Sequence, residues 1–163
     1  MIASLKPEYL HVLLNPLPVY GLAVSVLGLL LALISRTRGA RVTALALVFV
    51  CTLSAWPVYH YGEAAYDRVK ATIDDDGEKW LDEHVRRGEH LIWVFYLVAG
   101  LSAIAIAADI TSRRWAVPLT IAILILAGTV LGVGAYIGYA GGRVRHSEFR
   151  LEPPPESQAS GGN

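Results

Sequence analysis

The sequence predicts an all-α protein, a bundle of four transmembrane helices whose second and third helices extend into an acidic hairpin outside the membrane. Hydrophobic residues make up 54% of the chain and the mean hydropathy is +0.45, which is too apolar for an ordinary soluble domain. Four charge-free stretches each reach or exceed the roughly 18 residues that mark a spanning helix. They run over 17–34, 42–59, 91–108 and 115–142. None shows the period-two alternation of a barrel strand, so helices are predicted.

These stretches organise the chain as one membrane domain over 1–150. The predicted spans are 17–35, 42–61, 90–109 and 115–140. Proline suits the first turn of a helix, so the first span is expected to begin near Pro18. The segment 151–163 is rich in proline, serine and glycine, which is typical of a disordered polar tail.

The segment 62–89 is predicted to form the hairpin. Apolar residues at i, i+4 spacing continue the second helix beyond Tyr61, and the run Asp-Asp-Asp-Gly at 74–77 signals a turn followed by a new helix. With an equal rise in both arms and a turn centred at 75–76, His60 would reach the level of His90. Asp67 would likewise reach the level of His84.

Charge predicts the orientation of the bundle. The short connections 36–41 and 111–114 contain five arginines, and the only acid near them is Asp109, which Arg113 at i+4 can pair with. The rest of the chain holds nine basic and thirteen acidic residues. A plain count of basic residues favours this longer part as cytoplasmic, but we give more weight to the dense arginines of the short loops. Both termini are then extracytoplasmic.

All five histidines fall at this extracytoplasmic face, and they define the candidate site. Imidazole and carboxylate groups suit zinc, copper or iron, and paired histidines hold haem iron. A transition-metal ion or b-type haem is therefore the expected cofactor. The alternative is that these histidines are interfacial residues that bond to Glu63, Asn15 or lipid headgroups. The predicted ligands are His60, Glu63, His90 and His11, with Asp67 and His84 as a second, more solvated pair.

Four short segments resemble a known family. They read HVLLNPLPVYG (11–21), YGEA (61–64), WLDEH (80–84) and GYAGG (138–142). They are similar to a bacterial family of small four-helix membrane proteins, catalogued as a domain of unknown function, whose first helix typically begins H-P-x-x-V-H-F-P-I-G. The resemblance implies four spans in a bacterial inner membrane, the acidic hairpin, a histidine-bearing face and an association with redox modules. It implies no established reaction. Pro16 stands where the pattern has its second histidine, so a site of paired histidines in the first helix does not carry over.

The functional hypothesis is therefore a membrane protein that binds a metal ion or b-type haem in an electron-transfer or accessory role. The rival is a structural or assembly subunit without a cofactor, which docks a partner through its acidic hairpin. Besides the lipid bilayer, the expected partner is a membrane complex or a soluble redox protein. It would be bound by 62–89 or by the tail, and no nucleic-acid partner is expected.

Catalysis is not predicted, because no nucleophile with a placed base is visible. A proton pump would need ionisable groups in mid-span, and the sequence has none there.

Overall fold

The computed structural model describes residues 6–155, apart from the side chain of Arg113, and in this range the protein is helical without strands. Four helical segments are long and apolar enough to cross a membrane, which confirms the predicted all-helical class. The first comprises α1 (Pro7–Leu14), the π-helix η2 (Leu17–Gly21) and α2 (Leu22–Ser35), and the second comprises α3 (Arg38–Leu53) and α4 (Ala55–Lys70). The third is α5 (Asp75–Thr111), the fourth is α6 (Arg113–Arg145), and a short 3-10 helix, η3 (Ser147–Phe149), follows.

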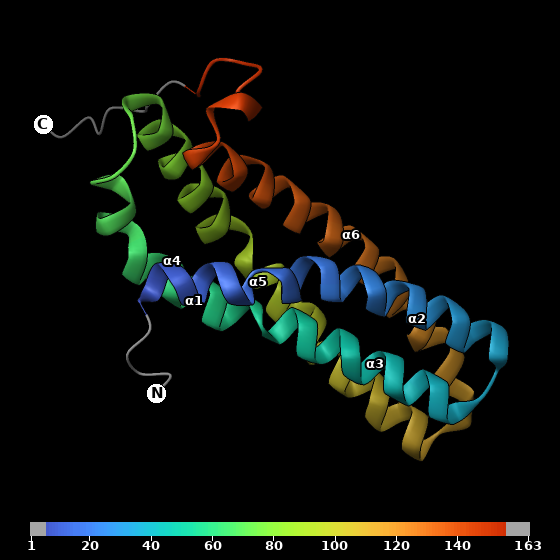
Figure 1. Ribbon diagram of the computed structural model, residues 1–163. Helices are drawn as coiled ribbons and strands as arrows, with labels where there is room; N and C mark the ends of the chain where they lie inside the picture. Colours follow the sequence, from blue (N-terminus) through green and yellow to red (C-terminus); the bar gives the residue numbers. More distant parts are fainter. Residues whose placement is uncertain (1–5, 156–163) are drawn as a thin grey trace, which may run out of the picture.

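A four-helix bundle forms one half of the molecule. Helices α2 and α3 pack there against the C-terminal half of α5 and the N-terminal part of α6 (Figure 1). Its core is made of aliphatic and small side chains with Phe95 among them. Large apolar side chains such as Leu31, Ile34 and Ile125 are exposed on its outside. An apolar surface of this extent is typical of a membrane-contacting protein.

Both of the first two helical segments break where proline removes a backbone donor. Pro18 cannot donate to the carbonyl of Leu14, where α1 ends, and the chain widens into the π-helix η2. Pro57 likewise cannot donate to the carbonyl of Leu53, where α3 ends. The first helix therefore begins at Pro7 and not near Pro18 as predicted, because the break is absorbed within a helix that continues on both sides.

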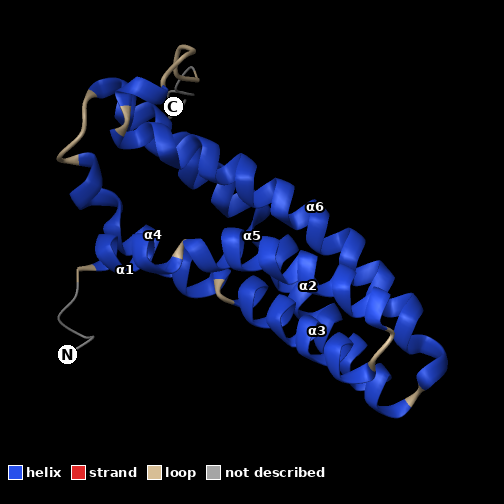
Figure 2. Ribbon diagram, turned by 45° about the vertical axis from the view of Figure 1, so that its right-hand side comes forward, coloured by secondary structure: helices blue, strands red, loops and turns tan. Residues whose placement is uncertain are grey.

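These breaks separate the other half of the molecule into two pairs of helices. Figures 1 and 2 show α1 and α4 together on one side, and the N-terminal half of α5 with α6 on the other. At the tip, Tyr66 and Val69 of α4 pack against a second core, which α5 and α6 form with Trp80, Leu81, Ala140 and Val144. The predicted extension of the second and third helices is thus present, and its position outside the membrane remains a prediction.

The register between α4 and α5 differs from the predicted one. Tyr66 donates a hydrogen bond to Asp82 at 2.6 Å, and Lys70 pairs with Glu78 at 2.6 Å. Both pairs are displaced by three residues from the expected register, because α4 already ends at Lys70 and Asp74 caps α5. The prediction that His60 faces His90 and that Asp67 faces His84 rested on a turn at 75–76 and is wrong in register.

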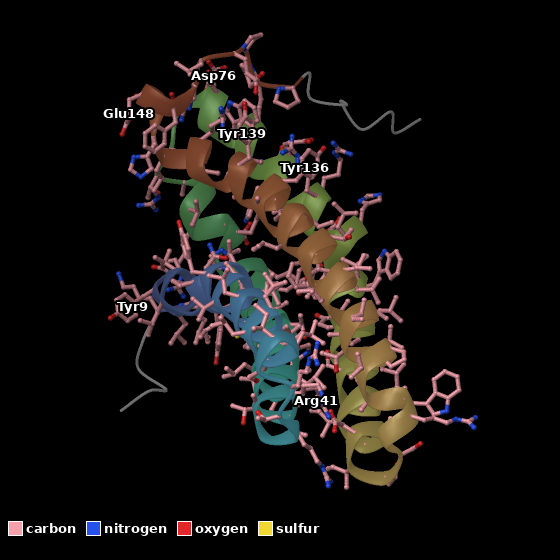
Figure 3. All side chains as sticks on the ribbon, turned by 90° about the vertical axis from the view of Figure 1, so that its right-hand side faces the viewer. Tyr9, Arg41, Asp76, Tyr136, Tyr139 and Glu148 are labelled. Carbon is pink, nitrogen blue, oxygen red and sulfur yellow. The ribbon has the colours of Figure 1, made fainter. Side chains whose placement is uncertain are left out.

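A C-terminal clasp closes the tip. The guanidinium of Arg150 donates to both carboxylate oxygens of Asp74, at 2.6 and 2.9 Å, and to the carbonyls of Arg143 and Val144. Figure 3 shows Asp76, Tyr139 and Glu148 at this end and Arg41 at the far end. Tyr139 donates to Glu152 at 2.6 Å, so the first residues of the predicted tail contact α6. The remainder of the tail, 156–163, lies outside the described residues.

Candidate functional site

A cavity lies between the bundle core and the core of the tip. About 530 Å³ of empty space lies between and in front of its walls, part of it open to solvent. It forms where α1 and α4 diverge from α5 and α6, and all of these helices contribute to its wall. Most of the wall is apolar, and the polar side chains that reach it are His11, Asn15, Tyr59 and His84. We call this space the histidine cavity.

His11 and His84 face each other in the histidine cavity. Their ring centroids are 6.1 Å apart and the ring planes are at 85°. The Nδ1 atom of His11 lies 2.8 Å from the carbonyl oxygen of Val58, and the Nδ1 atom of His84 lies 3.0 Å from that of Ile137. A carbonyl only accepts, so each Nδ1 carries a proton, and the tautomer with its single proton on Nδ1 has a lone pair on Nε2. Each imidazole is thus held in one tautomer by a neighbouring helix.

Glycines make room for both rings. A Cβ added to Gly62 on α4 would lie 2.9 Å from Nδ1 of His11. A Cβ added to Gly141 on α6 would lie 3.0 Å from both Cε1 and Nδ1 of His84. These distances are shorter than normal packing contacts, so a larger residue at either glycine would displace its ring. The two glycines are therefore part of the site.

The four residues predicted as metal ligands do not converge in the structure. His60 is exposed and its ring stacks on Trp56 with centroids 5.8 Å apart. His90 is also exposed, and its Nδ1 lies 2.8 Å from the carbonyl oxygen of Arg86 in its own helix. Glu63 is exposed on α4. Of the predicted set, only His11 reaches the histidine cavity, and there it meets His84.

No group of three or more histidine, cysteine, aspartate or glutamate side chains that could hold a metal ion occurs within residues 6–155. Asp67, the predicted partner of His84, is exposed on α4, whereas His84 contacts α6 and His11. Sequence reasoning thus assigned His11 and His84 to different sites. A signal for their common site existed on α5, because His84, Gly88, Ile92 and Phe95 follow at helical spacing and all line the cavity.

The charged side chains next to the cavity form ion pairs and hydrogen bonds with one another. Glu83 is buried and accepts hydrogen bonds from Arg86 and Arg87. Arg87 also donates to the carbonyl of Tyr136 at 2.7 Å, and its guanidinium lies 3.8 Å from the centre of the Tyr136 ring. This network ties α5 to α6 beside His84. The polar side chains left to a ligand are therefore the two imidazoles, Asn15 and Tyr59.

The chain matches no family model, no curated protein and no solved structure. The resemblance of its short segments to a bacterial membrane family thus stays an expectation.

Proposed function

We propose that this protein is a multi-pass protein of a bacterial inner membrane that binds one transition-metal ion between His11 and His84, in an electron-transfer or accessory role. The proposal keeps the metal chemistry expected from the sequence and moves it to another pair of histidines. Copper or iron at this site would suit electron transfer, and zinc would suit an accessory role. With the arginine-rich loops in the cytoplasm, the site lies at the extracytoplasmic side.

The spacing of the two rings is the observation that carries the proposal. Two imidazoles that bind one ion, each through a nitrogen about 2.0 Å from it, have ring centres about 5–6 Å apart, depending on the angle at the ion. The rings of His11 and His84 have centroids 6.1 Å apart. This value lies at the upper end of the range, which corresponds to a wide nitrogen–ion–nitrogen angle.

The hydrogen bonds of both rings support the same assignment. Histidines that bind metal ions usually donate the other ring N–H to a carbonyl or carboxylate, which fixes the ring and raises its basicity. His11 and His84 each make such a contact, to Val58 and Ile137. Only two protein nitrogens would bind the ion. Its remaining positions would be open to water or to another ligand in the cavity.

A b-type haem held by the same two nitrogens is the second form of this proposal. Axial imidazoles on opposite faces of one iron also have ring centres about 6 Å apart, given iron–nitrogen bonds of about 2 Å. The two forms differ in their visible spectrum. A bare ion gives no Soret band, whereas haem gives a strong one.

Metal analysis of the purified protein tests the proposal. Wild-type protein in detergent would be compared with His11→Ala and His84→Ala, and with His60→Ala and His90→Ala as matched controls from the same face. We expect about one metal ion per chain in the wild type and in both controls, and loss of the ion in the two cavity variants. The visible spectrum of each sample shows whether the ion belongs to haem.

Two outcomes would contradict this assignment. Loss of the ion in His60→Ala or His90→Ala, with retention in His84→Ala, would return the site to the residues expected from the sequence. Wild-type protein that takes up neither an ion nor haem would favour the rival function of a structural subunit with a docking hairpin.

Several acids of that hairpin already form ion pairs or hydrogen bonds within the protein, among them Asp74, Asp76, Glu78 and Asp82. Fewer carboxylates are then left to dock a partner.

A further inference from the structure

The histidine cavity is longer than an ion requires. Along α5 it extends from His84 to Phe95, eleven residues or about 16 Å at the rise of an α-helix. The polar side chains of its wall are those of His11, Asn15, Tyr59 and His84. Toward the bundle the wall consists of apolar groups such as Ile92, Phe95 and Val19. A ligand that fills this space would be an apolar body with a polar group at one end.

The two imidazoles specify which polar group fits. In the tautomer whose one ring proton is donated from Nδ1 to the carbonyl, Nε2 is a hydrogen-bond acceptor. A ligand group that bonds to either Nε2 must therefore be a donor, such as a hydroxyl. A carbonyl or ether oxygen would find no donor on either imidazole in this tautomer and would depend on Asn15 or Tyr59. An unpaired polar group in such surroundings is costly.

Access to the cavity is expected from the lipid. The cavity lies at the end of the four-helix bundle, and three exposed aromatic residues, Trp56, Trp93 and Tyr136, each directly precede or follow a residue of its wall in the sequence. Tryptophan and tyrosine concentrate at the membrane interface. The rings of Tyr59 and Phe95 in the cavity wall can pack against an aromatic ligand.

We propose that the histidine cavity binds a membrane-soluble phenol or hydroquinone, with its hydroxyl donating to Nε2 of His11 or His84 and its apolar body lying against α5 and α6. This inference goes beyond the proposed metal site and does not depend on it. A metal ion and a hydroxyl would use the same two nitrogens, so metal-free protein is the right material for the test. Absence of metal binding would leave this inference intact.

The test uses 2-decylhydroquinone and its dimethyl ether, which has nearly the same apolar body and no hydroxyl. Binding to EDTA-treated protein in detergent would be measured by calorimetry under anaerobic conditions. We expect the wild type to bind the hydroquinone about tenfold or more tightly than the ether, the factor that one or two net hydrogen bonds supply. His84→Ala and His11→Ala should each reduce this preference.

Substitutions of two glycines of α5 test whether the hydroquinone binds in the histidine cavity. A Cβ at Gly88 would point toward the ring of Tyr59, 3.9 Å away, so Gly88→Leu places a side chain in the cavity. A Cβ at Gly100 has no neighbour within 4 Å, and this residue is not part of the cavity wall. We expect at least tenfold weaker hydroquinone binding in Gly88→Leu and unchanged binding in Gly100→Leu. Gly88→Ala, with a normal contact distance, serves if the leucine variant does not fold.

Three results would overturn the inference. Equal binding of the hydroquinone and the ether would show partition into the micelle or a site without an acceptor. A preference that persists when both histidines are replaced would place the acceptor elsewhere. Equal binding by folded Gly88→Leu and Gly100→Leu would place the ligand outside the cavity.

Discussion

Arg41 and Asp109 form a buried, two-point ion pair between α3 and α5. Nε of Arg41 lies 2.7 Å from Oδ2 of Asp109, and Nη2 lies 3.0 Å from Oδ1. Both side chains are almost completely buried at the arginine-rich end of the bundle. A second arginine, Arg38, lies 3.9 Å from the same carboxylate. The pair fixes the ends of two helices to each other at this end of the bundle.

Removing one member of this pair should be strongly destabilising. Asp109→Ala would leave the guanidinium of Arg41 buried without its counter-charge, and such a loss costs about 3–5 kcal/mol. The free energy of unfolding in mixed micelles measures it. The double variant Arg41→Met/Asp109→Leu removes both charges and should retain most of the wild-type stability. If the single and double variants lost the same stability, the pair would not act as a unit.

This ion pair also shows where sequence reasoning ends. Asp109 stood out as the only acid near the short loops, and Arg113, one turn away, was its expected partner. The side chain of Arg113 lies outside the described part of the chain. The partner that the structure does describe is Arg41, on another helix and 68 positions earlier in the chain. Spacing within one helix identifies neighbours on that helix, but contacts between helices depend on how the helices are rotated and packed.

The same distinction separates the predicted fold from the candidate site. The four long helices follow from length and hydropathy, which are local properties of each stretch. The histidine cavity depends on two proline breaks that turn α1 and α4 aside, and on a turn that comes earlier than the acidic run suggested. An error of three residues in the register was enough to assign His84 to Asp67 and to leave its contact with His11 unseen.

The C-terminal clasp should depend on pH through Asp74. The hydrogen bonds from Arg150 lower the pKa of Asp74 from 3.8 to about 2. A carboxyl group with a lowered pKa in the folded state stabilises the fold above its unfolded pKa and loses this effect when it is protonated. The contribution of the clasp should therefore be constant above about pH 5 and disappear as the pH falls from about 4 to 2.

Asp74→Asn isolates this charge, because the amide oxygen can still cap α5 by accepting the N–H of Gly77. The measured quantity is the difference in apparent melting temperature between the wild type and the variant at each pH. We expect a wild-type advantage near pH 6 that shrinks toward zero near pH 2. Other titrating groups are common to both proteins and cancel in the difference. A difference that did not change with pH would show that the charge of Asp74 does not stabilise the clasp.

Two adjacent glycines of α6 should respond in opposite directions to alanine. A Cβ at Gly141 would press on the ring of His84 at 3.0 Å, while a Cβ at Gly142 meets nothing within 4 Å. Gly141→Ala should destabilise the fold by about 1–3 kcal/mol through overpacking and should weaken metal binding. Gly142→Ala should stabilise it by about 0.5–1 kcal/mol, because alanine favours a helix more than glycine does.

Thermal unfolding and the metal content of the two variants check this prediction together. Gly62→Ala extends it to the other ring, since its Cβ would lie 2.9 Å from Nδ1 of His11. The expected pattern is weaker metal binding in Gly62→Ala and Gly141→Ala and unchanged binding in Gly142→Ala. If Gly141→Ala bound metal as the wild type does, the position of the His84 ring would not matter for the ion.

The close contact between Gly21 and Cys51 should behave as a coupled pair. It lies where η2 meets the end of α3, and a Cβ at Gly21 would come within 2.9 Å of the Cys51 sulfur. Gly21→Ala should therefore destabilise the wild type by about 1–3 kcal/mol. In a Cys51→Ala background the nearest atom of residue 51 is its Cβ, at 3.9 Å, so the same change should cost little or become stabilising.

A double-mutant cycle on the free energy of unfolding measures this coupling, which we expect to be about 0.5–3 kcal/mol. Gly28→Ala is the matched control on the same helical segment. Its Cβ would lie 3.8 Å from the Cβ of Ala44, a normal contact, and it should show no coupling to Cys51→Ala.

The contact between Gly21 and Cys51 lies beside the breaks that turn α1 and α4 away from α5 and α6. Gly21→Ala should therefore also weaken ligand binding in the histidine cavity. Restored binding in the double variant, together with restored stability, would tie the cavity to the packing of these two residues, whereas additive losses would separate them.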